Sequence, residues 1–90
     1  MTSLQSLRNF RAHNAGRRIS FVSGNFKVIH PGHIRLLRFA REMADRLVVG
    51  VVPGNPWNAM VSERDRLENV NALNMVDLVC LLDTSLAEAL

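Results

Sequence analysis

Apolar residues along the chain follow two alternating patterns: short continuous runs, and longer stretches in which they recur every three or four positions. The continuous runs Ile19–Ser23, Leu47–Val52 and Val76–Leu82 are rich in β-branched residues, which predicts three buried β-strands. Helical spacing occurs over Ile34–Leu47 and again from Ser62 to about Asn74. Strands that alternate with amphipathic helices predict an α/β fold with a parallel sheet and a βαβαβ core.

Two further helices are expected at the ends of the chain. Leu4, Leu7 and Phe10 have helical spacing within Ser3–His13, with Ser3 as a possible cap. At the other end, Leu86–Leu90 begins a helical pattern and stops before two turns are complete. We therefore expect an N-terminal helix and linker over residues 1–17. Residues 18–90 are expected to be the N-terminal part of a longer, truncated domain.

Composition narrows the class of protein. The chain has 90 residues, of which 48% are hydrophobic and 21% charged, so one domain with a modest core is expected. No apolar stretch approaches the roughly 20 residues of a membrane span, and no secretory signal precedes the domain. Cys80 is the one cysteine, so no internal disulfide can form. These features favour a cytoplasmic protein without a membrane partner.

The net charge of +3 arises mainly from arginine, and Lys27 is the one lysine. Arginine suits phosphate and carboxylate partners because its guanidinium binds them through two parallel hydrogen bonds. Besides phosphate and carboxylate groups, an arginine-rich chain could bind nucleic acid. The sequence does not favour this alternative, because it lacks the interleaved aromatic residues of a known nucleic-acid-binding module.

Candidate chemistry is concentrated between the first strand and the next helix, from Gly24 to His33. Pro31 suits the first position of a helix, and a tight turn into a helix N-terminus is a geometry that binds phosphate. His30 and His33 can lie on one side of the first helical turn. Gly32, between them, leaves room for a phosphate near the backbone. Imidazoles placed there can donate hydrogen bonds to phosphate oxygens.

This segment resembles the G-x-F-D-x-x-H-x-G-H motif of the cytidylyltransferase-like nucleotidyltransferases, with matches at Gly24, Phe26, His30, Gly32 and His33. Ser62 and Arg66 are similar to the S-x-x-x-R motif of the same family, so the resemblance covers about Arg18 to Leu82. Within the family, the chain looks most like the adenylyltransferase domain of ADP-heptose synthases and like nucleotidyltransferase domains fused to sugar kinases. Glycerol-3-phosphate cytidylyltransferase comes next.

The resemblance implies a Rossmann-like domain in which a sugar or polyol phosphate attacks the α-phosphate of CTP or ATP and pyrophosphate leaves. His30, His33 and Lys27 would be the catalytic residues. The residues expected to bind nucleotide or phosphate are Gly24, Asn25, Phe26, Gly32 and Arg66. Mg²⁺ would accompany the triphosphate, with no organic cofactor and no metal site made by the protein itself.

Two departures from the family pattern leave an alternative open. Lys27 stands where the family usually has Asp, which reverses the local charge by two units. The later I-S-[ST]-T-x-x-R motif does not occur in this sequence, and the segment from Pro53 to Val61 holds no lysine. The second hypothesis is therefore a catalytically impaired module that binds nucleotide or phosphate.

The family's strand order, 3-2-1-4-5, carries a further expectation. With three strands only, the strand Ile19–Ser23 lies at an open edge, and an exposed apolar edge invites pairing with another chain. We therefore expect the chain to form a homo-oligomer or to be part of a longer protein.

For several residues a structural role is the alternative. Arg66 could pair with acidic residues on its own helix, Trp57 could cover a loop, and Cys80 could be inert core.

Overall fold

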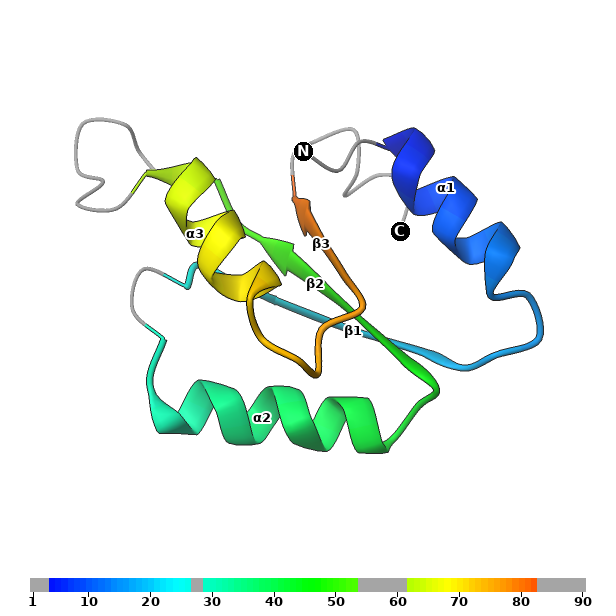
Figure 1. The fold of residues 1–90 in the computed structure, drawn as a ribbon, viewed down its shortest axis with the longest axis horizontal. Coiled ribbons are helices and arrows are strands. Elements are labelled where there is room, and N and C mark those ends of the chain that lie inside the picture. Colours follow the sequence, from blue (N-terminus) through cyan, green and yellow to red (C-terminus); the bar gives the residue numbers. More distant parts are fainter. Residues whose placement is uncertain (1–3, 27–28, 54–61, 83–90) are drawn as a thin grey trace.

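The computed structural model describes residues 4–26, 29–53 and 62–82 of the chain. Helices and strands alternate along it after a first helix, as Figure 1 shows. The elements are α1 (Leu4–His13), β1 (Ile19–Gly24), α2 (Pro31–Glu42), β2 (Arg46–Val51), α3 (Glu63–Asn71) and β3 (Leu78–Leu81). This order confirms the α/β fold predicted from the apolar pattern.

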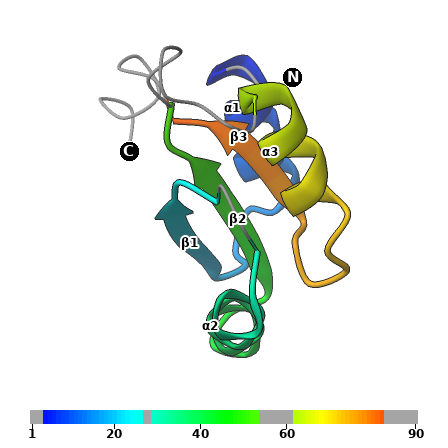
Figure 2. The ribbon, with the colours of Figure 1, turned by 90° about the vertical axis from the view of Figure 1, so that its left-hand side faces the viewer.

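The three strands form one parallel sheet in the order β1-β2-β3, with β2 between its two neighbours (Figure 2). Val48 of β2 is aligned with Phe21 of β1 and with Leu78 of β3. Within the described residues β1 therefore has one partner strand, as expected for a sheet that follows the family order as far as strand 3. The carboxyl ends of β1 and β2 lie side by side, where Gly24 is aligned with Val51.

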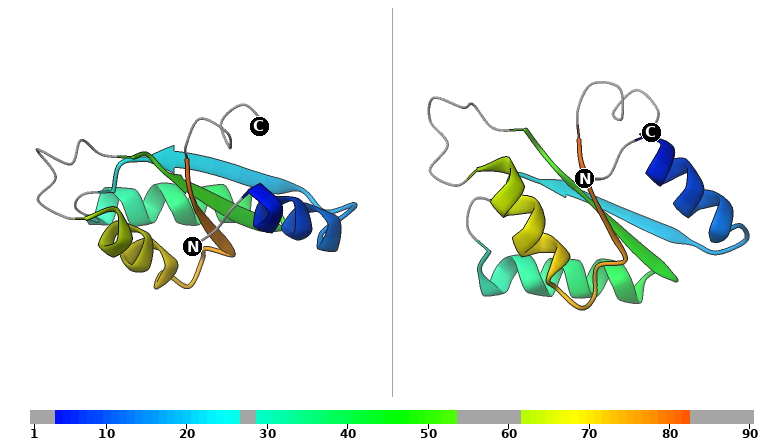
Figure 3. Two further views of the ribbon diagram at one scale, coloured as in Figure 1. Left: turned by 90° about the horizontal axis from the view of Figure 1, so that it is seen from above. Right: turned by 45° about the horizontal axis from the view of Figure 1, so that its top comes forward.

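Alternate residues of β2 point to opposite faces of the sheet, and each face carries its own core. On one face Leu47, Val49 and Val51 pack with Leu37 of α2 and with two residues of α3, Leu67 and Val70. On the other face Val48 packs with Leu7 of α1 and with Cys80. In Figure 3, α3 and the first turn of α2 lie towards one end of the sheet and α1 towards the other.

Helix α2 is shorter than its apolar pattern predicts. The pattern continues to Leu47, but the helix ends at Glu42 with Met43 as C-cap, and Leu47 belongs to β2. The turn between them is held by Arg18, whose carbonyl accepts from the backbone N–H groups of Asp45 (2.8 Å) and Arg46 (3.2 Å). The carboxylate of Asp45 in turn accepts from the N–H of Arg18 at 2.9 Å. These contacts join residues distant in sequence, so local periodicity cannot reveal them.

The outer side of α2 carries apolar as well as charged side chains. Met43 fits the helical spacing of the apolar residues, yet it is 59% exposed; Leu36 is 51% and Phe39 60% exposed. Arg35 and Arg38 are exposed. Arg41 is partly buried, and its Nε lies 3.1 Å from the carboxylate of Asp77.

The remaining boundaries differ by a few residues. Helix α3 ends at Asn71 rather than Asn74, and Ser62 caps its start by accepting from the N–H of Asp65 at 3.1 Å. Strand β3 begins at Leu78 rather than Val76. Cys80 is buried, as expected. The predictions for Ser3, Lys27, Trp57 and the helix Leu86–Leu90 lie outside the described residues. Among the described helices, none is long and apolar enough to cross a membrane.

Candidate functional site

The two predicted histidines form a reciprocal cap at the start of α2. His30 is the N-cap residue, and its Nδ1 accepts a hydrogen bond from the backbone N–H of Gly32 at 3.0 Å. His33 occupies the third helical position, and its Nδ1 accepts from the backbone N–H of His30 at 3.2 Å. Pro31 begins the helix between them, where its missing N–H costs nothing. The H-x-x-H spacing thus performs the task that S-x-x-E performs in an ordinary capping box.

The cap determines which ring nitrogen of each histidine can donate. Because both Nδ1 atoms accept from backbone N–H groups, the proton of each neutral imidazole is assigned to Nε2. The rings lie together, with centroids 4.0 Å apart and planes inclined by 38°. His30 is exposed and His33 is half-buried. The arrangement presents two neighbouring Nε2–H groups at the positive end of a helix, which suits an anion with several oxygens.

The backbone of the first turn contributes less than the sequence suggests. Gly32 donates to the His30 ring, while the N–H groups of His33 and Ile34 donate to the carbonyl of His30 at 2.9 and 3.3 Å. The space beside Gly32 is filled by the same ring, since a Cβ added to Gly32 would lie 2.8 Å from His30 Cε1. In this structure the donors directed away from the helix are therefore the imidazoles rather than the amides.

Phe26 packs against the histidine pair through the ring of His33. Its backbone is left-handed, with φ of 53°, an uncommon conformation for a bulky residue. The ring is 6% exposed and lies 5.6 Å from the ring of His33, centroid to centroid. Gly24 makes room for it, because a Cβ at that position would lie 2.9 Å from Phe26 Cε2. Phe26 is thus a packing residue under the site, and Gly24 allows that packing.

Arg66 reaches the same region from α3. Its side chain is buried, and Nη1 donates to two carbonyl oxygens, those of Asn25 and Val52, each at 2.8 Å. These carbonyls follow the ends of β1 and β2. Arg66 forms no ion pair with an acidic residue in the described part of the chain, so the alternative of pairing on its own helix gains no support there. Its Nε and Nη2 atoms have no hydrogen-bond partner in the described part of the chain.

The donor set fits an anion and not a magnesium ion. Mg²⁺ prefers carboxylate, phosphate and water oxygens, whereas the described residues of this site supply imidazole N–H and guanidinium groups. In residues 4–26, 29–53 and 62–82 no three His, Cys, Asp or Glu side chains come close enough to hold a metal ion. A metal at this site would therefore depend on oxygens brought by a ligand.

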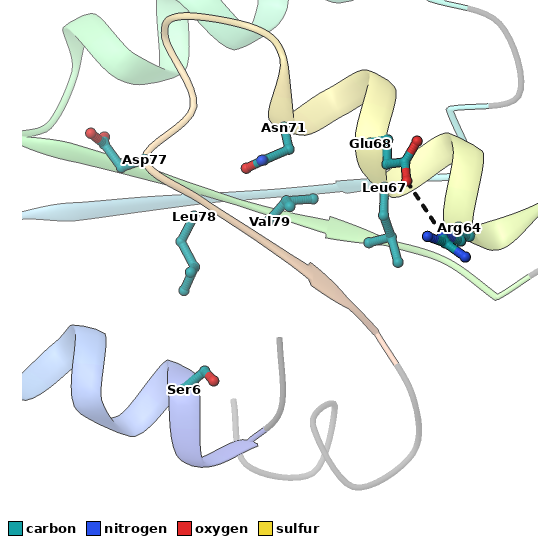
Figure 4. A pocket seen from close by; sticks show the side chains of 8 residues that line it. All are labelled: Ser6, Arg64, Leu67, Glu68, Asn71, Asp77, Leu78 and Val79. Carbon is teal, nitrogen blue, oxygen red and sulfur yellow. Dashed lines mark hydrogen bonds and ion pairs between the residues drawn. The ribbon is translucent and has the colours of Figure 1, made fainter. Parts of the chain in front are cut away.

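A groove of about 750 Å³ lies elsewhere, between α3, β3 and α1 (Figure 4). It contains none of the predicted site residues, and its charged groups are already paired. Arg64 lies 3.4 Å from Glu68, and Asp77 binds both Arg41 and the N–H of Leu47. We assign it no role in the site.

The structure brings most of the predicted site residues together at the carboxyl ends of β1 and β2. These are Gly24, Asn25, Phe26, His30, Gly32, His33 and Arg66. Lys27 lies outside the described residues. Sequence reasoning missed the capping role of the histidines, which the three-residue spacing could have revealed. It also missed the left-handed Phe26 and the carbonyl of Val52, for which no sequence signal exists.

Comparison with known proteins bears on this geometry directly. A sequence profile described as cytidylyltransferase-like matches residues 21–86, which include the histidine pair, Phe26 and Arg66. The chain belongs to the cytidylyltransferase-like family. The bifunctional protein HldE of Hyphomonas neptunium is 40% identical over 77 residues, which are 78% of this chain and 16% of that protein. HldE of Methylobacillus flagellatus is 36% identical over 87 residues, 89% of this chain and 17% of that protein.

The cytidylyltransferase-like fold is also found in a solved structure, the lipopolysaccharide core biosynthesis protein from Thermoplasma volcanium. The two folds agree with a TM-score of 0.73 at 25% identity, over 82% of this chain and 66% of that one. The family match and the HldE relatives together indicate that this chain is a nucleotidyltransferase. The chain spans about a sixth of the length of the curated relatives it matches.

Proposed function

We propose that this chain binds the triphosphate of CTP or ATP at the histidine pair and serves nucleotidyl transfer to a sugar or polyol phosphate. The observation that carries the proposal is the reciprocal cap, which engages Nδ1 of two neighbouring rings and leaves Nε2–H as the donor of each. A triphosphate presents several oxygens with delocalised charge, and adjacent N–H donors at a helix N-terminus suit such a group. The HldE relatives and the lipopolysaccharide protein support a carbohydrate acceptor.

In the proposed reaction a phosphate oxygen of the acceptor attacks the α-phosphorus of the triphosphate. The new P–O bond forms as the bond from the α-phosphorus to the bridging oxygen breaks, and pyrophosphate leaves with the electron pair. His30 and His33 would donate hydrogen bonds to phosphate oxygens as negative charge shifts during this exchange. Both rings are held by their own cap, so they need little reorganisation when the ligand arrives.

Mg²⁺ belongs to the proposal as the metal of the metal–triphosphate complex. Among the described residues no three His, Cys, Asp or Glu side chains come together to hold it, so the triphosphate itself would supply ligands to the ion. Its contribution when bound would be to neutralise part of the phosphate charge.

A second candidate, a binding module that does not turn over, is favoured by Lys27. A cation at this position can attract a phosphate, but it repels the metal that the family's usual Asp would attract. The two candidates agree on binding and differ on pyrophosphate release.

Substitutions that preserve the cap give the sharpest test of the site. His30→Asn keeps a strong N-cap residue, and His33→Gln keeps the N3 partner of a capping box, while both replace the imidazole Nε2–H donor by a side-chain amide of different reach and direction. We expect both variants to retain the helix content and melting temperature of the wild type. Each should bind CTP or ATP about tenfold more weakly or worse, which corresponds to about 1.4 kcal/mol for each lost hydrogen bond to a charged group.

Calorimetric titration with each nucleotide in the presence of Mg²⁺ measures the affinity, and release of pyrophosphate is followed with a panel of sugar and polyol phosphates. Chelation of Mg²⁺ should abolish release. Binding without release, together with release gained in Lys27→Asp, would favour the binding module. Wild-type affinity in both histidine variants would disprove the proposed site.

A further inference from the structure

The buried guanidinium of Arg66 is under-satisfied for a charged group. Burial of a charge is costly unless hydrogen bonds compensate it, and guanidinium has five N–H groups to satisfy. Two of its three nitrogens, Nε and Nη2, have no partner among the described residues, and the third is shared between two carbonyls. The side chain is only 1% exposed, so water does not replace the missing partners. A core made for stability alone would have an apolar residue here.

The two carbonyl groups that Arg66 binds indicate the role of its buried guanidinium. The carbonyl of Asn25 belongs to the peptide group that joins Asn25 to Phe26. The torsion angle φ of Phe26 starts at this carbonyl carbon, so the orientation of the peptide group helps to set φ. Arg66 holds this oxygen towards α3 at 2.8 Å, and Phe26 then continues with φ of 53°. The second carbonyl, that of Val52, fixes the same guanidinium to the end of the neighbouring strand.

The conformation of Phe26 in turn determines where its ring lies. With the left-handed backbone, the ring folds over Gly24 and reaches the ring of His33, 5.6 Å away between centroids. An extended backbone at Phe26 would direct the side chain elsewhere. A continuous series of contacts therefore runs from Arg66 through the Asn25–Phe26 peptide and the Phe26 ring to His33.

We propose that Arg66 is a positioning residue, which holds the left-handed Phe26 through the Asn25 carbonyl and thereby places His33 for its ligand. It does not contact the phosphate itself, since its side chain is buried. The effect on the protein's own conformation is independent of any ligand. The consequence for triphosphate binding rests on the proposed function.

The test compares Arg66→Met, which keeps an apolar stem but loses the donors, with Arg64→Met on the same helix. Arg64 is exposed and bonds only Glu68 among the described residues, so it controls for the loss of one positive charge from α3. Nuclear magnetic resonance of the full 90-residue chain reports φ of Phe26 through the three-bond coupling between its HN and Hα protons. Cross-relaxation between ring protons reports the contact of Phe26 with His33.

We expect Arg66→Met to lose both the positive-φ coupling and the ring contact, and Arg64→Met to retain them. Inorganic triphosphate should bind about tenfold more weakly to Arg66→Met, because a displaced donor loses most of its interaction. Its affinity for Arg64→Met should stay within about twofold, the range of an exposed charge change.

Arg66→Lys provides a second arm if Arg66→Met does not fold. The shorter ammonium lacks the planar fork, so the signals of Phe26 and His33 should shift in this variant too. Unchanged coupling and ring contacts in the Arg66 variants would overturn the inference, even if their melting temperature falls. If the wild type itself fails to bind triphosphate, the proposed function is contradicted. The coupling of Phe26 and its ring contact with His33 would then still decide the role of Arg66, because they are measured without a ligand.

Discussion

At the scale of single residues, His30 and His33 use one ring nitrogen for the fold and the other for a ligand. Nδ1 of each ring satisfies a backbone N–H that would otherwise lack a partner at the helix start. Nε2 is thereby left as the donor. Substitution of either histidine by an apolar residue would therefore disturb the helix and the site together. Only substitutions that preserve the cap can separate the two effects.

Gly32 offers a prediction at the same scale. A methyl group at this position would lie 2.8 Å from Cε1 and 3.0 Å from Nδ1 of the His30 ring, so in Gly32→Ala the ring has to move and its bond to the residue 32 N–H is lost. Alanine favours the helix by about 1 kcal/mol over glycine, and loss of an N-cap costs about the same. We expect a melting temperature close to that of the wild type and a nucleotide affinity at least several-fold lower.

Calorimetric titration and thermal melting of Gly32→Ala measure these two quantities. Ala40→Gly, in the last turn of the same helix, is the reverse change far from the histidines and should lower stability without lowering affinity. Equal affinity in Gly32→Ala and the wild type would show that the position of the His30 ring does not matter for binding.

Several features of these residues follow from the sequence and others do not. The histidines, Gly24, Phe26 and Arg66 are identified by their motif spacing, and the structure brings them together. The sequence alone leaves open whether Arg66 is exposed or buried, because its spacing on α3 allows either. The left-handed φ of Phe26 depends on a hydrogen bond from a residue 40 positions further along the chain. Such a contact leaves no local pattern.

At the scale of helices and strands, the number, kind and order of the described elements follow from apolar periodicity, and their ends do not. The end of α2 is decided by the turn that Arg18 and Asp45 hold across the start of β1. The start of β3 is similarly fixed by Asp77, whose carboxylate accepts from the N–H of Leu47 at 2.7 Å. Each carboxylate accepts a hydrogen bond that joins a loop to the beginning of another strand. Neither hydrogen bond can be predicted from the local apolar pattern.

Asp45 gives a pH-dependent prediction for this turn. The backbone hydrogen bond from Arg18 lowers the pKa of its carboxyl group. Desolvation opposes this shift, and the charges of Arg18, Arg17 and Arg46 lower the pKa further. Because the pKa is lower in the folded state, the carboxylate stabilises the fold above the pKa of the unfolded chain, about 3.9. This contribution is lost as the pH falls through the folded-state pKa.

Urea unfolding of the wild type and Asp45→Asn between about pH 7 and pH 2 measures the effect. We expect the wild type to be the more stable protein at neutral pH and the difference to shrink below about pH 4. Glu42→Gln removes an exposed carboxylate and should show a smaller change. A difference that stays constant over the whole range would assign the effect of Asp45 to packing rather than to charge.

At the scale of the whole molecule, one side of α2 forms an apolar stripe, defined as Leu36, Phe39 and Met43, each more than half exposed. The three residues have helical spacing, so they form a continuous strip along the outer side of the helix. Arg35 and Arg38 flank its first half and Glu42 flanks its end. Two copies of α2 packed antiparallel would bury both stripes and bring these opposite charges together. The described sheet has a second unpaired element, the edge of β1.

We therefore expect the chain to self-associate through the stripe, and Phe39→Lys to weaken that association. Sedimentation velocity over a concentration series measures the average mass, which should rise with concentration in the wild type and much less in the variant. Ala12→Lys adds the same charge on the exposed side of α1 and should behave like the wild type. Association that survives Phe39→Lys would point instead to an edge of the described sheet, that of β1 or that of β3.

The sheet also contains a residue whose chemical reactivity can report local opening of the fold. Cys80 is the one cysteine of the chain, its side chain is fully buried in β3, and its Sγ lies 3.7 Å from the carbonyl of Val49. A thiol reagent can reach it only when α1 moves away from this face of the sheet, β3 separates from β2, or the whole domain unfolds, so the labelling rate of the native protein measures how often such openings happen. Labelling that slows when nucleotide is added would reveal that occupancy of the site at the carboxyl ends of β1 and β2 suppresses these openings.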